Sequence, residues 1–529
     1  MFIRQVLQPI LSAIDHFPER NAFYIRDRFY TYREFAVNIA RVRSALKAGG
    51  VTSRRVGLAA RDDIETYASI VALWLEGLAY VPLHPSQPPE RIRSIVSQAE
   101  IRLIIDSSPH PIDTRLPAMT TSGLSFDGAD LLPKFAGDDE LAYILFTSGS
   151  TGAPKGVPIT RMNLGAFMNA FTQSGVQITE CDRCLQPYDL TFDASVQSYL
   201  SPLTSGACAY TVPHDVIRFS YASDLLSTNR LTLCALTPSM IRYLRPYFDE
   251  IRLPDLRLCL LIGEASPVDL IEAWAPCVPN ARIINYYGPT EATVYCASYE
   301  YRSGARNKHV NGMLAVGRPM PGMTAVVADE TNSILGAGQS GELCVSGPQV
   351  MPGYWHDDGK NDRVFFEQVH EGAVRRFYRT GDAGSIDEEG DILLAGRLDH
   401  QVKIDGYRIE LGEIEYHARN FLGGADAAAV VCRNTKGGGQ IALFVEGASI
   451  DAGALSAYLR ARLPSYMIPA EIRAIKRFAL NAHGKVDRLM LPMQLSAGDE
   501  KAELVTGMGA DRPGAERMER WENRTLHRG

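Results

Sequence analysis

The stretch YILFTSGSTGAPKGV, from Tyr143 to Val157, decides how the chain is interpreted. The apolar run from Tyr143 to Phe146 predicts a short strand, and a segment made almost entirely of Thr, Ser and Gly follows it. Small residues let backbone N–H groups approach an anion closely, and consecutive amides form an anion-binding nest. Because the hydroxyls add donors and Lys155 adds a positive charge, the stretch predicts a polyphosphate site.

This loop differs from the P-loop of kinases and GTPases, because the pattern GxxxxGK[ST] followed by a helix is absent. Lys155 lies between Pro154 and Gly156, and the next residues, VPIT, are largely β-branched, which favours a strand over a helix. Taken alone, a Gly/Ser run is equally compatible with a flexible surface loop. The motifs farther along the chain decide between the two interpretations.

Composition limits the class of protein. A chain of 529 residues is too long for a single core and predicts more than one domain. Hydrophobic content of 46% and charged content of 22% are typical of a globular protein, and the net charge of −7 argues against nucleic acid or an anionic membrane surface as the main partner. The longest apolar stretch, Tyr67 to Leu83, is interrupted by Glu76 and Gly77 and is too short to span a bilayer. We therefore expect a cytoplasmic protein with no membrane partner.

The cysteines indicate free thiols. The nine cysteines have no disulfide-scaffold spacing. The CxxC pair Cys181–Cys184 has no second pair and no nearby His, so buried thiols in a reducing compartment are favoured over a metal or redox site.

Helices and strands alternate through the first ~400 residues, which predicts the α/β class. Val56–Ala60 reads as a strand and Ile64–Glu76 as a helix. Further helices are expected at Leu164–Phe171, Tyr221–Thr228, Pro267–Ala275, Leu411–Leu422 and Leu455–Leu463, and further strands at Leu256–Ile262 and Ile283–Tyr287. From Leu335 onward, short strands separated by turn residues predict a small barrel or sheet. From Ser496 onward, the charged, Gly-punctuated sequence predicts a disordered tail.

Two further motifs carry groups that suit a nucleotide. NYYGPTEATVYC, residues 285–296, combines aromatic rings that can stack on a purine with Thr290, a donor for phosphate, and Glu291, an oxygen ligand for Mg²⁺. YRTGD, residues 378–382, places Asp382 after a Gly turn, where a carboxylate can accept from ribose hydroxyls. Each motif alone is also compatible with a turn that carries a solvated carboxylate.

Together, these motifs resemble those of the adenylate-forming superfamily of acyl-CoA synthetases, luciferases and nonribosomal peptide synthetase adenylation domains. The resemblance covers roughly residues 5 to 495 and includes AYVPLHPSQPPERI and GELCVSGPQVMPGYW. GRLDHQVKIDGYRIELGEIE (396–415) and NAHGKVDR (481–488) are similar to the amino-acid-activating branch. The implied protein is an amino acid–carrier protein ligase.

The resemblance also implies the domain organisation. A large domain, residues 1–398, would contain two αβ subdomains and a small β-barrel, and a small mobile α+β domain would follow over residues 399–495, with the tail at 496–529. By motif, the hinge is Asp399. Rotation would withdraw Lys485 and bring the loop of Gly406 toward a tunnel for a phosphopantetheine thiol.

The implied cofactors are ATP and Mg²⁺. The loop that contains Lys155 would hold the β- and γ-phosphates, Tyr287 would stack on adenine, Asp382 would bind the ribose, and Lys485 would reach the substrate carboxylate and the α-phosphate. A carboxylate is already a nucleophile, so the enzyme needs no general base; it must align the reactants and neutralise the phosphate charge. The implied ATP-binding residues are Thr147, Ser148, Gly149, Ser150, Thr151, Gly152, Lys155, Tyr287, Gly288, Thr290, Asp382 and Arg397; the implied catalytic residues are Lys485, Thr147 and Glu291, with Glu291 as the metal ligand.

The resemblance places the substrate class on FDASVQ, residues 192–197. Asp193 would pair with an α-ammonium group, and acyl- and aryl-acid enzymes lack a carboxylate there, since a buried charge without a partner is costly. By spacing, the other pocket residues are Ala194, Gln197, Ala235, Leu260, Ile262, Gly263, Tyr286, Val294 and Tyr295. No charged side chain lines this set, so we expect a small or medium, mostly apolar amino acid; a cyclic, proline-like acid and a β-amino acid are both compatible.

Three functions remain open at this point. The first is an enzyme that makes an aminoacyl-AMP, releases pyrophosphate and loads a separate carrier protein, because no carrier-type serine motif follows Lys485 and no condensation motif precedes the chain. Such a stand-alone enzyme is expected to be a monomer or weak dimer. The second is a CoA ligase of the same superfamily, which Asp193 disfavours. The third is a catalytically silent adenylate-binding scaffold, which the intact motifs disfavour.

Overall fold

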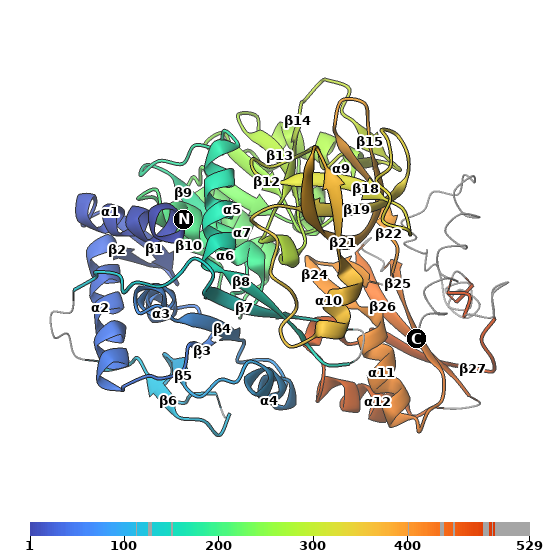
Figure 1. The fold of residues 1–529 in the computed structure, drawn as a ribbon, viewed down its shortest axis with the longest axis horizontal. Helices are drawn as coiled ribbons and strands as arrows, with labels where there is room; N and C mark the ends of the chain where they lie inside the picture. The colour runs from blue at the N-terminus through green and yellow to red at the C-terminus, as the bar shows by residue number, and fades with distance from the viewer. Residues whose placement is uncertain are drawn as a thin grey trace.

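The structure of the chain, a computed structural model, describes residues 1–112, 114–124, 130–149, 152–399, 401–433, 438–447, 450–479, 486–488, 490 and 491. Ser150, Thr151, Lys485 and the expected tail from 496 to 529 lie outside these residues. Figure 1 shows two large sheets with their helices, a smaller sheet beside them, and a C-terminal group of strands and helices next to the smaller sheet.

The first large sheet carries the Gly/Ser-rich loop. Across the sheet, its strands are β6 (Ala118–Thr120), β5 (Ile104–Asp106), β3 (Arg55–Ala59), β4 (Ala79–Leu83), β7 (Leu141–Thr147) and β8 (Lys155–Thr160). The paired strands are parallel except for β7 and β8, which are antiparallel. The loop therefore joins two hydrogen-bonded strands, which holds Thr147 opposite Lys155.

The second large sheet has a parallel centre. Its strands, in spatial order, are β17 (Arg318–Pro319), β14 (Ala297–Tyr301), β13 (Arg282–Tyr287), β12 (Leu258–Leu261), β11 (Leu233–Leu236), β9 (Arg183–Gln186), β10 (Cys208–Thr211), β1 (Asn21–Ile25) and β2 (Arg28–Thr31). Strands β13 to β1 run parallel, and β14, β17 and β2 are antiparallel to their neighbours. The carboxyl ends of parallel strands are where α/β proteins place their ligands.

A single apolar core connects the two sheets. α3 (Ile64–Leu75) begins at Asp63, whose side chain accepts a hydrogen bond from the Thr66 amide, and nearly all its residues are buried. The same core contains Tyr80 of the first sheet and Leu260 of the second. The two sheets therefore act as one rigid support for the residues at their edges.

The remaining helices confirm the α/β class expected from the sequence. They are α1 (Gln8–His16), α2 (Tyr32–Ala48), α4 (Pro89–Gln98), α5 (Arg161–Gln173), α6 (Asp193–Leu203), α7 (Arg218–Thr228), α8 (Pro238–Leu244), α9 (Val268–Trp274) and α10 (Asp358–Val364). A π-helical turn, Ile3–Leu7, precedes α1. No helix within the described ranges is long and apolar enough to cross a membrane.

The smaller sheet stands where a small β-barrel is expected. It contains β18 (Thr324–Ala328), β19 (Gly341–Ser346), β21 (Ala373–Ile386) and β20 (Phe365–His370), and β22 (Ile392–Arg397) also pairs with β21. All of its pairings are antiparallel. In the described part of the chain no pairing between β18 and β20 closes the sheet, so the arrangement is an open sheet.

The C-terminal part has its own hydrophobic core. It begins with the hairpin of β23 (Gln401–Ile404) and β24 (Tyr407–Glu410) and continues through α11 (Leu411–Phe421), β25 (Ala427–Arg433), β26 (Gly439–Glu446), α12 (Ala452–Arg460) and β27 (Glu471–Ile475). Ile409, Ile414, Leu443 and Leu455 belong to this core, which is separate from the core of the two large sheets. This α+β part meets the remainder of the chain mainly through polar contacts of the hairpin and of α11.

Candidate active site

The loop between β7 and β8 forms the first wall of the site. The Thr147 hydroxyl is buried and has no hydrogen-bond partner among the described residues. Lys155 is buried at the start of β8, and burial, together with the nearby Arg408 guanidinium, lowers the pKa of its ammonium group to about 8. A buried donor without a partner and a buried cation at the same loop are features of a site for an anion.

The short helical turn Thr290–Ala292 places Glu291 opposite this loop. The Glu291 carboxylate is fully buried; it accepts a hydrogen bond from the Tyr354 hydroxyl at 2.5 Å, and Lys155 Nζ lies 4.0 Å away. Arg408 Nη1, from β24, lies 2.6 Å from the other carboxylate oxygen. Burial alone would raise the pKa of Glu291, but the two cations hold it well below its usual range. Glu291 is therefore ionised and is paired with Arg408 and Lys155.

The turn after Glu291 is strained. Thr293 and Val294 both have positive φ, of 55° and 70°, a conformation that β-branched residues rarely adopt and that costs about 1–3 kcal/mol per residue. Gln349 holds this turn: its side-chain Nε2 donates to the Tyr295 carbonyl at 2.6 Å, and its main-chain carbonyl accepts from the Thr293 hydroxyl at 2.6 Å. Backbone strain of this kind is common at functional sites, and periodicity in the sequence does not reveal it.

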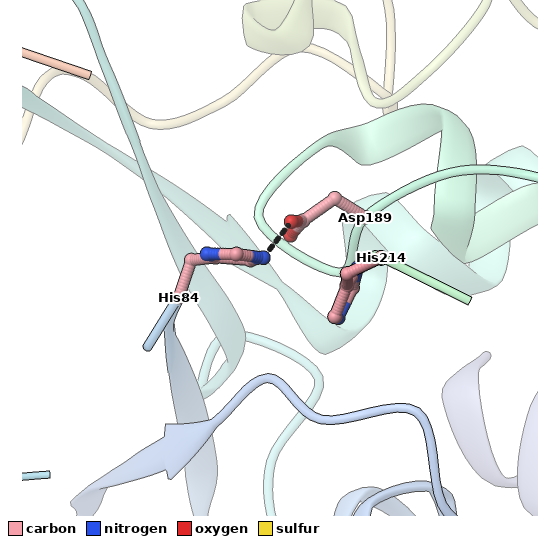
Figure 2. A group of neighbouring side chains, drawn as sticks. All are labelled: His84, Asp189 and His214. Carbon is pink, nitrogen blue, oxygen red and sulfur yellow. Dashed lines mark ion pairs between the residues drawn. The ribbon is translucent and has the colours of Figure 1, made fainter. Parts of the chain in front are cut away.

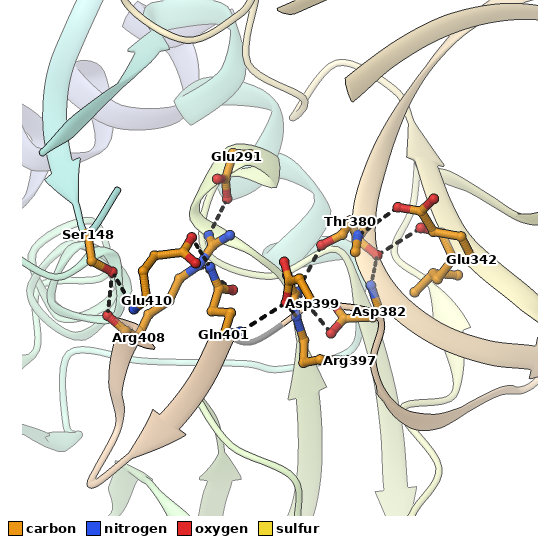
Figure 3. A network of polar contacts seen from close by, with 12 residues as sticks. Ser148, Glu291, Glu342, Thr380, Asp382, Arg397, Asp399, Gln401, Arg408 and Glu410 are labelled. Atoms are coloured by element: carbon orange, nitrogen blue, oxygen red, sulfur yellow. Dashed lines mark hydrogen bonds and ion pairs between the residues drawn. The ribbon is translucent and has the colours of Figure 1, made fainter. Parts of the chain in front are cut away.

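Tyr287, Asp382 and Arg397 meet at one corner of the site. The Tyr287 hydroxyl donates to Asp382 Oδ2 at 2.5 Å, and Arg397 Nη1 donates to Asp382 Oδ1 at 3.1 Å. Arg397 also forms a two-pronged ion pair with Asp399, with distances of 2.9 and 2.6 Å (Figure 3). The structure thus brings Tyr287 next to Asp382 and Arg397, which follow it by 95 positions or more. Gly288 packs so closely beside them that a Cβ there would lie 2.6 Å from Tyr295 Cα.

Asp193 is the first residue of α6 and is half-buried. Burial raises the pKa of its carboxyl group, although hydrogen bonds from the Thr290 hydroxyl and from the Ala194 amide oppose the shift. Thr290, expected to donate to a phosphate, therefore bonds to Asp193 in this structure. A cationic partner would therefore stabilise the ionised form of Asp193.

The other predicted pocket residues gather at the carboxyl ends of β11, β12 and β13 and on α6. Gln197, Ala235, Leu260, Ile262, Tyr286, Val294 and Tyr295 are buried, Ala194 is half-buried, and Gly263 is exposed. Tyr286 and Tyr295 stack with ring centroids 4.8 Å apart. The Tyr295 hydroxyl donates to Gln197 Oε1 at 2.9 Å, and Gln197 Nε2 donates to Ser201 at 3.0 Å. The polar atoms of Gln197 are thus satisfied by the protein, which leaves this wall apolar.

The β23–β24 hairpin enters the site from the C-terminal part. Gly406, at its tip, has φ +81° and donates its amide hydrogen to Glu264 Oε1 at 2.5 Å. A Cβ at this position would lie 2.9 Å from Thr237 Cγ2, so both the conformation and the space favour glycine. Near the tip, Tyr407 stacks on Tyr466 at 4.1 Å and touches Phe192, the residue before Asp193.

The sequence motifs did not reveal which charged residues of the β23–β24 hairpin and of the first turn of α11 contact the site. Arg408, Glu410 and Glu413 contact Glu291, Lys155 and the Gly149 amide respectively. Lys403 of β23 is exposed, but it interacts electrostatically with Asp382 and Asp193. The contacts of Arg408, Glu410 and Glu413 join positions more than 100 residues apart, so only the spacing of charges in RIELGE could have indicated them. Gly152 lies against the Tyr416 ring of α11.

A second group of polar side chains lies away from this site, at His84, Asp189 and His214 (Figure 2). His84 Nε2 is 2.8 Å from Asp189 Oδ2, while His84 Nδ1 accepts a hydrogen bond from the Ser86 amide at 3.1 Å. The proton of the imidazole is therefore on Nε2, where a metal would need a bare nitrogen. Burial would raise the pKa of Asp189, but the hydrogen bond from His84 outweighs it and lowers the pKa to about 2. The group is better described as a hydrogen-bonded histidine–carboxylate pair than as a metal centre.

The cysteines lie outside this chemistry. All nine are free, and Cys181 is exposed whereas Cys184 is buried, so the CxxC pair offers no shared site.

The assembled site can hold a nucleotide phosphate chain beside a carboxylic acid. An anion-binding loop and a buried acidic residue with cationic partners face each other, and the buried, mostly apolar residues of the predicted substrate pocket and the Asp193 carboxylate belong to the elements beside them. This set provides positioning and charge neutralisation rather than a nucleophilic side chain.

Comparison with known proteins identifies a family and several relatives of this chain. A profile described as AMP-binding enzyme matches residues 12–355. Tyrocidine synthase 1 of Brevibacillus parabrevis is 30% identical over 502 residues, which cover 92% of this chain and 45% of the relative. The chain spans 14%, 9% and 13% of the length of three other curated relatives.

Two solved structures share the fold closely. Holo-PA1221, described as an NRPS protein containing adenylation and PCP domains bound to a vinylsulfonamide inhibitor, has a TM-score of 0.82 and 25% identity, covering 92% of this chain and 84% of the other. The Vibrio cholerae adenylation domain AlmE, solved with glycyl-adenosine-5'-phosphate, has a TM-score of 0.81 and 25% identity, covering 92% and 97%. The chain belongs to the AMP-binding enzyme family.

Proposed function

We propose that this enzyme joins an amino acid to AMP, releases pyrophosphate, and transfers the aminoacyl group to the phosphopantetheine thiol of a carrier protein. The observation that carries the proposal is Asp193: a half-buried residue at the start of α6, next to the buried residues of the predicted pocket, whose carboxyl pKa is raised by burial. An incoming α-ammonium group would form a direct ion pair with this carboxylate, which otherwise interacts electrostatically with Lys403. A fatty or aromatic acid would leave it without this ion pair.

The described residues fit ATP and Mg²⁺. Glu291 is a buried oxygen ligand that already holds a cationic group, and the unpartnered Thr147 hydroxyl points to a missing acceptor at the phosphate loop. Mg²⁺ is commonly held by one or two carboxylates together with substrate phosphates, and when bound it neutralises phosphate charge. Glu291 would hold the metal, and Thr147, Ser148, the Gly149 amide and Lys155 would hold the β- and γ-phosphates.

Asp382 and Tyr287 would bind the nucleoside. Their present contact, with Arg397 bonded to the other oxygen of Asp382, supports this assignment, because ribose hydroxyls would donate to the same two carboxylate oxygens. The buried Tyr287 ring would lie against adenine. Lys485, which lies outside the described residues, would then neutralise the α-phosphate while the substrate carboxylate attacks the α-phosphorus.

We also propose two moving parts, residues 1–398 and 399–495, with Asp399 as the hinge. The separate hydrophobic cores support this division, and the ion pair of Asp399 with Arg397 anchors the hinge to β22. In the present arrangement the Gly406 turn lies in the site, a position that suits thioester formation. The solved relative with adenylation and PCP domains supports a carrier as the thiol acceptor.

The pocket walls favour a small or medium apolar amino acid. The stacked rings of Tyr286 and Tyr295 take up part of the predicted pocket. The polar atoms of Gln197 are already hydrogen-bonded to Tyr295 and Ser201. A charged side chain would find no partner there. A compact ring such as that of proline matches these walls, and AlmE, solved with a glycyl adenylate, is an example of a relative with a small amino acid in its site.

The test is amino-acid-dependent ATP–pyrophosphate exchange over a panel of amino acids. We expect strong exchange with one or a few small apolar members and none with Lys, Asp or Glu. A second assay offers CoA or a phosphopantetheinylated carrier as the thiol acceptor. Thioester formation on the carrier supports the proposal, whereas transfer to CoA alone would identify the enzyme as a CoA ligase, and absence of exchange with every acid would leave a silent scaffold.

A further inference from the structure

The segment from Arg408 to Glu413, RIELGE, carries three charges into the phosphate end of the site. The first is Arg408, whose Nη1 lies 2.6 Å from Glu291 Oε2 (Figure 3). Arg408 and Glu291 belong to different parts of the chain, separated by 117 positions. The guanidinium therefore takes the place that the proposed function gives to Mg²⁺.

The two acidic residues of the segment meet the groups assigned to phosphate. Glu410 Oε1 lies 3.2 Å from Lys155 Nζ. Glu413 Oε2 accepts a hydrogen bond from the Gly149 amide at 3.1 Å, and its other oxygen lies 2.7 Å from Arg91 Nη1. Both carboxylates are almost completely buried.

The backbone of the segment also forms hydrogen bonds with the β7–β8 loop. The Ser148 hydroxyl donates to the Arg408 carbonyl at 3.0 Å and accepts from the Glu410 amide at 3.2 Å. One cation and two anions thus occupy, in a single chain segment, the partners that a metal ion and two phosphate groups would require.

We propose that the segment Arg408–Glu413 is an intramolecular mimic of Mg²⁺·pyrophosphate and competes with it for the same groups. The inference rests on the proposed function only for the assignment of Glu291 and of the β7–β8 loop. It adds a specific consequence: Mg²⁺·pyrophosphate and the seated hairpin exclude each other, because both need Glu291, Lys155 and the Gly149 amide.

Charge balance gives the competition its physical basis. When Mg²⁺·pyrophosphate leaves, Glu291 and Lys155 would remain buried, 4.0 Å apart, without their external partners, which is unfavourable. Arg408 and Glu410 each supply a closer partner of opposite charge, 2.6 Å from Glu291 and 3.2 Å from Lys155. Since the Gly406 turn lies just before the segment and bonds to Glu264, the same movement seats this turn in the site. Release of pyrophosphate thereby sets the position of the C-terminal part.

The experiment measures hydrogen exchange of the amides from 401 to 413 in the full-length protein, titrated with inorganic pyrophosphate in excess Mg²⁺. In the wild type we expect exchange to be slow without ligand and to become faster as Mg²⁺·pyrophosphate binds. Isothermal titration calorimetry on the same samples measures binding itself, so displacement of the hairpin is read separately from affinity and from catalysis.

Four variants make the test specific. Arg408→Met and Glu410→Gln each remove one mimic charge and should lower the pyrophosphate concentration at half-displacement by at least about 5-fold, the low end of coupling between two sites. Arg408→Lys keeps the charge and should recover most of the wild-type value. Arg462→Met removes an ion pair with Glu90, 3.6 Å long, between the same two parts of the protein but away from the site, and should leave the value unchanged.

Each outcome decides the inference. Binding of Mg²⁺·pyrophosphate without faster exchange in the hairpin would overturn it, as would equal shifts in Arg408→Met and Arg462→Met. No detectable binding would overturn both the inference and the assignment of the phosphate loop. Displacement with the expected variant pattern in an enzyme that shows no exchange with any amino acid would support the inference and contradict the proposed substrate class.

Discussion

At position 193 two physical effects oppose each other. The first turn of α6 and hydrogen bonds from Thr290 and Ala194 favour the ionised carboxylate, whereas burial favours the neutral acid, and burial prevails because the pKa is raised. Because of the same burial, a substrate ammonium group would stabilise the ionised carboxylate more than the partial charge of the helix terminus does.

This balance predicts the pH dependence of the first half-reaction. A carboxyl group with a raised pKa loses its charge at a higher pH than an ordinary Asp, so kcat/KM for the amino acid should fall as pH decreases through that raised value. Asp193→Asn should abolish this acidic limb and lower kcat/KM by about 10²-fold, the scale for removing one partner of a buried charge pair. Pyrophosphate-exchange rates measured from pH 5 to 8 check both statements; an unchanged limb in the variant would assign it to another group.

Lys485 provides a second prediction at this scale. Lys485→Ala should reduce adenylate formation by about 10²–10³-fold, the scale for losing one donor that stabilises developing charge. Transfer from a supplied aminoacyl-AMP should be much less affected, because Lys485 would act only at the α-phosphate. Pyrophosphate exchange close to the wild-type rate would remove the lysine from the mechanism.

At the scale of elements, strand β22 leads directly into the hairpin that fills the site. Asp399 sits between them, and its carboxylate accepts from Arg397 and from the Gln401 amide. If this residue absorbs the rotation, its φ must change between the two states, and proline would fix φ and prevent the change.

We therefore expect Asp399→Pro to spare one half-reaction and impair the other. Adenylation should stay within a few-fold of wild type, while carrier loading should fall by roughly 10-fold or more, since proline blocks the rotation that loading requires. Single-turnover loading beside pyrophosphate exchange separates the steps, and Asp399→Ala is the matched control. Equal loss of both steps in the proline variant would place the boundary elsewhere.

The elements also show what a sequence can reveal. Contiguous motifs located the β7–β8 loop, Glu291 and Asp382 because each motif is a local turn attached to a recognisable strand. The partners of these residues could not be located, because Arg408 reaches Glu291 through a hairpin that follows 117 positions later. The strained turn at Thr293 was also missed, since periodicity carries no information about positive φ in a β-branched residue.

At the scale of the whole molecule, the C-terminal part of the chain has a hydrophobic core of its own. The core of the two large sheets and the core around Ile409 and Leu443 do not share residues. Alternation of apolar segments along the sequence predicted the α/β class, but it could not place the C-terminal part against the loop. That placement depends on ion pairs between distant residues.

Separate cores predict stepwise unfolding. The C-terminal part should melt in its own transition, with an enthalpy of about 60–80 kcal/mol, the value typical of 100 residues. Differential scanning calorimetry resolves the transitions, and Mg²⁺ with a nonhydrolysable ATP analogue should raise the temperature of the larger one. Coincident melting under all conditions would mean that the two cores behave as one cooperative unit.

The most direct test of the central claim compares an accepted amino acid with the same acid lacking its amino group. The account predicts that the wild type exchanges pyrophosphate with the amino acid at least about 10²-fold faster, in kcat/KM, than with the deaminated acid, because only the former supplies a cation to Asp193. Asp193→Asn should erase most of this difference. Equal exchange with both acids in the wild type, or a preference for the deaminated acid, would contradict the account.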